Sequence, residues 1–104
     1  MLFTEALPSF AAELERLLKK QGHAELAAQV SMLKIVDRCR CGDDFCASFY
    51  TEPKPQGAYG ADHRCVELEL EKGMLILDVV RDKIAHVELL HRQDIRERLL
   101  VSLP

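Results

Sequence analysis

The sequence lacks the features that mark membrane-spanning and exported chains. None of its apolar runs approaches the roughly 20 residues that a helix needs to cross a bilayer. Its first residues, Met-Leu-Phe-Thr-Glu-Ala-Leu-Pro, contain no basic segment ahead of a long apolar stretch, as a secretory signal would. We therefore expect a cytoplasmic protein with no membrane partner.

The sequence also has no excess of basic residues. Fourteen basic residues stand against 17 acidic ones, which gives a formal net charge of -3 at pH 7. Proteins bind phosphate backbones through an excess of clustered Lys and Arg, so no nucleic-acid partner is expected. Gly57-x-x-Gly60 lacks the Lys-Ser/Thr continuation of a phosphate loop, and no serine has the surroundings of a nucleophile elbow. These absences favour a protein that is not an enzyme.

The residues that are present suit one globular unit. The chain has 104 residues, of which 48% are hydrophobic and 30% charged, and the apolar residues are dispersed among the charges. This length is near the commonest size of a single domain, and we find no internal repeat or low-complexity tract. A single domain over residues 1–104 is therefore predicted.

Apolar residues recur at helical spacing from residue 9 to residue 20 and again from residue 23 to about residue 33. The stripes consist of Phe10, Leu14, Leu17 and Leu18 in the first segment and Leu26, Val30 and Leu33 in the second. Ser9 can accept a backbone hydrogen bond in the first turn, and Gly22 ends the first element. The pattern predicts an N-terminal helical hairpin.

From residue 34 the period changes to two, which is typical of strands. Residues 38–51 read as a tight hairpin around Gly42, and residues 52–62, with two prolines and two glycines, as an irregular loop. Residues 63–71, 74–80 and 83–90 predict three antiparallel strands joined by short turns, and residues 93–101 a closing helix. The fold class is thus α+β, a helical hairpin packed on an antiparallel sheet of about five strands with a short C-terminal helix. The predicted core includes Leu14, Leu17, Val30, Leu68, Leu70 and Ile76.

Cysteine spacing is the main chemical feature. Cys39-x-Cys41-x4-Cys46 is followed by His63-x-Cys65, so five soft or borderline metal ligands fall within 27 positions. Cys41 and Cys46 flank a four-residue turn, and His63 and Cys65 share one strand face. If the cluster binds metal, we expect Cys39 or Cys41, with Cys46 and Cys65, to surround one zinc ion, and His63 to be the substitute ligand.

Two other interpretations stay open. Cysteines are among the most buried residue types and pack as small hydrophobes, and this metal-free role is the leading interpretation. Cys41 and Cys46 are also candidates for a thiol-dependent redox protein or sensor, although no Cys-x-x-Cys stands at a helix N-terminus to depress a thiol pKa.

The segment Cys39-Arg40-Cys41-Gly42 resembles the opening of the SEC-C type of zinc-binding motif, in which C-x-C-G leads to a Cys-Cys or Cys-His pair. Here Cys46 follows instead, and no such pair comes after it. The whole C-x-C-G-D-D-x-C hairpin with its meander is similar to small bacterial proteins, a resemblance that implies no established activity.

The sequence as a whole favours a non-enzymatic binding or accessory protein. A meander that ends in an open strand leaves backbone groups unpaired, and proteins commonly cover or pair such edges. We therefore expect a homodimer, together with a protein partner that the sequence does not identify.

Overall fold

The computed structural model describes all 104 residues and confirms the α+β class. Its elements are α1 (Phe3–Ala6), α2 (Pro8–Lys20), α3 (Ala24–Ala27), the 3-10 turn η1 (Val30–Met32), β1 (Asp37–Arg38), β2 (Phe49–Tyr50), β3 (His63–Leu68), β4 (Met74–Val80), β5 (Lys83–Leu90) and α4 (Gln93–Ser102). The strands form one antiparallel sheet in the order β1-β2-β5-β4-β3. No helix has both the length and the apolar character that a membrane span requires.

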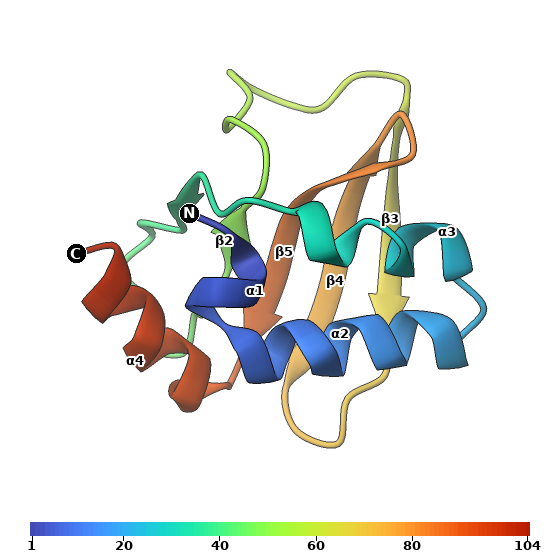
Figure 1. Ribbon diagram of the computed structural model, residues 1–104. Coiled ribbons are helices and arrows are strands. Elements are labelled where there is room, and N and C mark those ends of the chain that lie inside the picture. The colour runs from blue at the N-terminus through green and yellow to red at the C-terminus, as the bar shows by residue number, and fades with distance from the viewer.

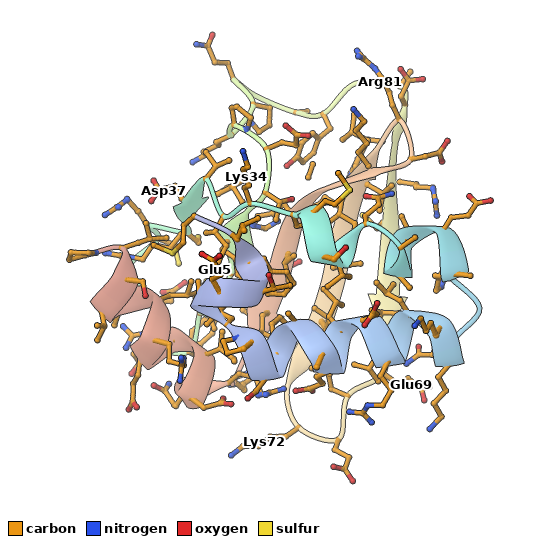
Figure 2. All side chains as sticks on the ribbon, viewed as in Figure 1. Glu5, Lys34, Asp37, Glu69, Lys72 and Arg81 are labelled. Atoms are coloured by element: carbon orange, nitrogen blue, oxygen red, sulfur yellow. The ribbon has the colours of Figure 1, made fainter.

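Helices cover one face of the sheet. In Figure 1, α1, α2 and α3 lie across that face, and α4 closes the side nearest β2. The α2 helix starts at Pro8, where the missing N–H costs nothing because the first helical amides have no intrahelical acceptor. Its buried residues Phe10, Leu14 and Leu18 pack into a core of 22 side chains between helices and sheet. Figure 2 shows charged side chains such as Lys72 and Arg81 projecting outward from the turns.

The predicted meander of β3, β4 and β5 is confirmed. One of its faces packs against the helices, and the other, here called the outer face, is not covered by them. Leu68 of β3 is buried, as are Leu14 and Val30, while Leu17 and Leu70 are partly buried against the core.

Ile76 is a wrong core prediction. It pairs with Glu67 and Glu88 on the outer face, whereas its neighbours Leu75 and Leu77 are buried. The near-continuous apolar run of β4 hides the period of two, so the sequence alone does not tell which residues of this strand face inward.

The second predicted helix is mostly absent. Only α3 and η1 form in residues 23–33. Between them the side chain of Gln29 donates to Asp82 O in the turn between β4 and β5 and accepts from Ile84 N of β5. From Leu33 the chain is extended. It pairs there with the N-terminus, since Phe3 N donates to Leu33 O and Lys34 forms an isolated β-bridge with Leu2. Long-range hydrogen bonds therefore override the local helical stripe.

The predicted hairpin over residues 38–51 forms, since β1 and β2 pair in antiparallel orientation, but it is not tight. The strands β1 and β2 have two residues each, and the ten residues 39–48 connect them as an irregular loop. This loop is held from outside: Ala47 N donates to Leu89 O, and Cys46 forms an isolated bridge with Leu90. Residues 52–62 are irregular as predicted and arch over one end of the sheet from β2 to β3 (Figure 1).

Candidate metal centre

Three cysteines meet in the loop between β1 and β2. Cys39 extends the β1–β2 pairing by one step, since its N–H donates to Ser48 O at 2.8 Å, and Cys46 is fixed by its bridge to β5. Gly42 lies between them with φ of 84°, a left-handed conformation that favours glycine and lets the chain reverse. The sulfur atoms of Cys39, Cys41 and Cys46 all lie within 4.8 Å of one another. All three are free thiols.

The three thiols are not equivalent. Burial and the neighbouring Cys41 and Cys46 raise the pKa of Cys39 to about 11. Burial also works to raise the pKa of Cys46, but hydrogen bonds involving Ser48 and the thiols of Cys41 and Cys39 outweigh it and lower that pKa. Cys46 therefore becomes a thiolate more readily than Cys39, and thiolates are the form that binds metal.

Two arginines lie close to the thiols. A small cavity of about 30 Å³ is lined by Cys39 and Cys46 together with Arg38 and Arg96. Arg38 is held in place because its guanidinium donates to the backbone oxygens of Cys39 and of the C-terminal residues Leu103 and Pro104. A zinc ion on three thiolates carries a net negative charge, which such cations offset.

His63 and Cys65 lie elsewhere. They point outward from β3, and their ligand atoms form a second group with a carboxylate oxygen of Asp78, again within 4.8 Å of one another. Both β4 and β5 separate β3 from β2, a distance of three strand spacings of about 4.8 Å each. The structure thus divides the five predicted ligands between two groups, three in the loop and two on β3.

Asp78 is a site residue that sequence reasoning missed. It is the one charged residue in the apolar strand β4. A carboxylate in such a strand is unusual, and this could have marked Asp78 as a candidate site residue. Burial alone would raise the pKa of its carboxyl, but hydrogen bonds from His63 and His86 outweigh burial and lower it. Burial and the nearby carboxylates of Asp78, Glu88 and Glu67 raise the pKa of Cys65, so this thiol lacks the environment of an activated nucleophile.

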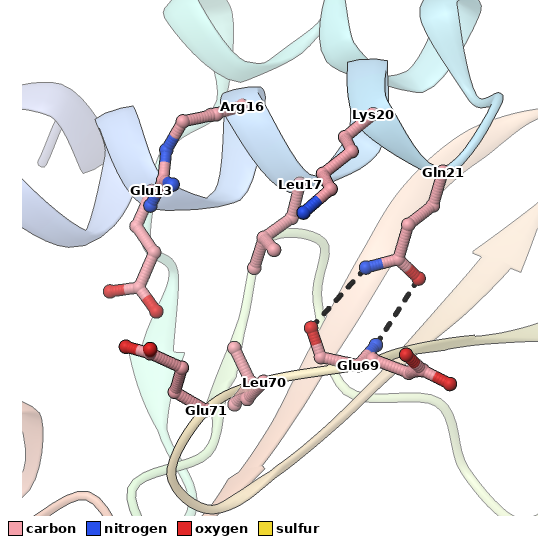
Figure 3. A pocket seen from close by; sticks show the side chains of 8 residues that line it. All are labelled: Glu13, Arg16, Leu17, Lys20, Gln21, Glu69, Leu70 and Glu71. Atoms are coloured by element: carbon pink, nitrogen blue, oxygen red, sulfur yellow. Dashed lines mark hydrogen bonds between the residues drawn. The ribbon is translucent and has the colours of Figure 1, made fainter.

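The largest pocket lies away from both groups. Its volume is about 670 Å³. Figure 3 shows that it lies between α2 and the chain after β3. Both acidic and basic side chains line it, and at one end Gln21 makes two hydrogen bonds with the backbone of Glu69, both 3.2 Å. Only two of its eight lining residues are hydrophobic, so it does not resemble the mostly apolar pockets that bind small molecules.

Comparison with protein-family models, with curated proteins and with solved structures gave no match. Function is therefore inferred from the side chains themselves. Among them, the three converging thiols offer the most specific chemistry, which is binding of a soft or borderline metal ion.

Proposed function

We propose that this protein is a non-enzymatic binding or accessory protein that holds one zinc ion on Cys39, Cys41 and Cys46. The observation that carries the proposal is the convergence of three sulfur atoms within 4.8 Å on a segment of eight residues. Zinc–sulfur bonds of about 2.3 Å place sulfur atoms about 3.8 Å apart, so small side-chain rotations suffice to close the site.

The surroundings support metal binding over simple packing. Cys41 is exposed and Cys39 and Cys46 are only partly buried, whereas cysteines that serve as small hydrophobes are usually fully buried. The lowered pKa of Cys46 eases the loss of its proton to a metal ion, and Arg38 and Arg96 offset the negative charge of the bound thiolates. Thiolate donors select zinc or copper(I) over magnesium and calcium.

Three protein ligands leave the fourth position of a tetrahedral zinc ion open. Water fills that position in the isolated protein, and a side chain of a protein partner takes it in a complex. In this arrangement the loop between β1 and β2 binds the partner, through its zinc ion, at the surface of a cytoplasmic protein.

Metal content of the Cys65→Ser variant tests the proposal, because only the three clustered thiols remain in it. Prepared without chelator, this variant should carry about one zinc per chain. Adding Cys39→Ser and Cys46→Ser should remove the zinc, since one thiolate does not hold it at micromolar concentration. Cys65→Ser protein that stays metal-free in excess zinc, with three titratable thiols, would rule out the zinc site.

A redox role is the second candidate, and one observation favours it. Cys46 has a lowered pKa and lies within reach of two other thiols, which is the arrangement of an attacking thiolate and its partner. In that role two thiols form a disulfide, and their two protons and two electrons cleave the O–O bond of a peroxide, which becomes two waters or an alcohol and one water. Treatment with a peroxide should then remove two titratable thiols in the Cys65→Ser variant, and dithiothreitol should restore them.

Self-association belongs to the same proposal. The six-residue strand β3 pairs only with β4, so its other edge has free backbone groups. We expect two copies to meet along this edge as a homodimer. Light scattering from micromolar to millimolar concentration should give twice the monomer mass of 11.8 kDa, and a monomer mass throughout would remove this part of the proposal.

A further inference from the structure

The face of the sheet that the helices leave uncovered carries a second cluster of donor atoms. Cys65 of β3 pairs with Asp78 of β4, and Asp78 pairs with His86 of β5, so three side chains stand in one row across the sheet. His63, two residues before Cys65, points to the same side and reaches the Asp78 carboxylate. We propose that His63 Nε2, Cys65 Sγ and Asp78 Oδ1 form a second, independent site for a zinc-like divalent cation.

The separations of the three atoms suit tetrahedral coordination. Metal–ligand bonds of about 2.0 Å to nitrogen or oxygen and 2.3 Å to sulfur place sulfur about 3.5 Å from the other donors, and nitrogen about 3.3 Å from oxygen. Cys65 Sγ lies 3.8 Å from His63 Nε2 and 3.6 Å from Asp78 Oδ1. The nitrogen–oxygen separation is 2.7 Å, a hydrogen bond that opens slightly as the cation replaces the shared proton.

Neighbouring side chains hold these ligands as supporting residues do in zinc sites. His86 Nδ1 lies 2.9 Å from Asp78 Oδ2, so it fixes the carboxylate and leaves Oδ1 free for the cation. The ring of Tyr50 packs on His86 with centroids 4.4 Å apart, and Tyr59 packs on His63 at 4.7 Å. The Asp78 carboxylate is only 18% exposed, so its orientation is set before a cation binds.

The wider surface also favours a cation. Glu67 and Glu88 lie on the same face, in the adjacent row on either side of Ile76. Their charges add to that of Asp78, and an exposed site with excess negative charge attracts divalent ions.

The same geometry excludes a Cys–His–Asp nucleophile. In such a triad the thiol and the carboxylate contact opposite nitrogens of the imidazole, so that one nitrogen takes the proton while the other is oriented. Here both Cys65 and Asp78 contact Nε2 of His63. A donor set around a shared centre fits the arrangement better than a proton relay.

The test uses a variant in which Cys39, Cys41 and Cys46 are all replaced by serine, so that Cys65 is its only thiol. We expect it to bind one zinc per chain, and zinc to slow alkylation of Cys65 by iodoacetamide at least tenfold. Adding His63→Ala or Asp78→Asn should abolish both effects. Adding His86→Gln should weaken zinc binding by about 10- to 100-fold, the usual effect of losing a supporting hydrogen bond.

Glu15→Gln is the control, since it also removes one carboxylate charge but lies on α2, away from this face, and it should leave zinc protection in place. If the triple variant does not fold, the wild-type chain provides the second measurement: Cys65→Ser should lower its zinc content from two ions to one. Equal alkylation rates with and without zinc, or equal zinc content in the wild-type and Cys65→Ser chains, would overturn the second site. Either result leaves the zinc on the three loop cysteines unaffected, so the two proposals fail separately.

Discussion

Gly73, in the turn between β3 and β4, adopts a backbone conformation that L side chains rarely take, with φ of 95°. A Cβ atom at this position would lie 2.5 Å from the backbone oxygen of Leu90 on β5 and 3.2 Å from the side chain of Arg92. The backbone oxygen cannot move without disturbing the sheet. Glycine is required here both for its φ angle and for the close approach of another strand.

Gly73→Ala should therefore destabilise the protein by about 3 kcal/mol or more, since a left-handed residue costs about 1–2 kcal/mol and the contact adds to it. Gly57→Ala is the control, because Gly57 has φ of 88° but nothing within 4 Å of the added carbon. It should cost about 1 kcal/mol. Equal losses in chemical denaturation would contradict the close approach at Gly73.

Arg92 joins two elements, because it precedes α4 and reaches α2. Its guanidinium donates to both carboxylate oxygens of Glu13, at 2.9 and 3.1 Å, and to those of Asp94, both at 3.1 Å. The hydrogen bond from Arg92 outweighs burial and lowers the pKa of Asp94. A carboxyl with a lowered folded-state pKa stabilises the fold above its unfolded value of about 3.9, and this contribution is lost as pH falls through the folded value.

Asp94→Asn should consequently make the protein less stable at pH 7, and the difference from wild type should shrink as the pH falls below about 4. Urea denaturation of both proteins at pH 7 and at low pH measures it. A difference that stays constant or grows toward acid pH would mean that the Asp94 charge does not contribute.

Leu68 and Ile76 test the orientation of the meander strands. Leu68 is 5% exposed and faces the helices, so Leu68→Ala should cost about 2–5 kcal/mol. Ile76 faces outward between two glutamates, and Ile76→Ala should cost less than half as much. The free energy of unfolding from denaturant titration gives both values, and a loss at Leu68 within experimental error would show that the register is wrong.

At the scale of the whole molecule, two candidate metal sites share the sheet. Tyr50 on β2 packs on His86 beside one of them, and burial together with the charges of Cys39, Asp78, Cys46 and Cys41 raises the pKa of Tyr50. The helices cover the opposite face, so both proposed sites lie on the uncovered face or in the loop beside it (Figure 1).

The parts of this arrangement that follow from local pattern were predictable. The α2 helix has an uninterrupted apolar period, and short turns bound the strands of the meander. Cys39, Cys41 and Cys46 meet because eight residues of one loop carry them all. The neighbours of Cys65 depend instead on the register of β3 against β4, which brings in Asp78 from 13 positions away. Register depends on the turn and on which residues of each strand face the core, and the near-continuous apolar run of β4 hides the latter. The partners of Cys65 were therefore not predicted.

The most direct test of the zinc proposal is X-ray absorption at the zinc edge, on Cys65→Ser protein with one equivalent of zinc. The account predicts three sulfur atoms at about 2.3 Å and one nitrogen or oxygen atom at about 2.0 Å. A first shell of nitrogen and oxygen alone, or protein that retains no zinc, would contradict the assignment of Cys39, Cys41 and Cys46 as its ligands.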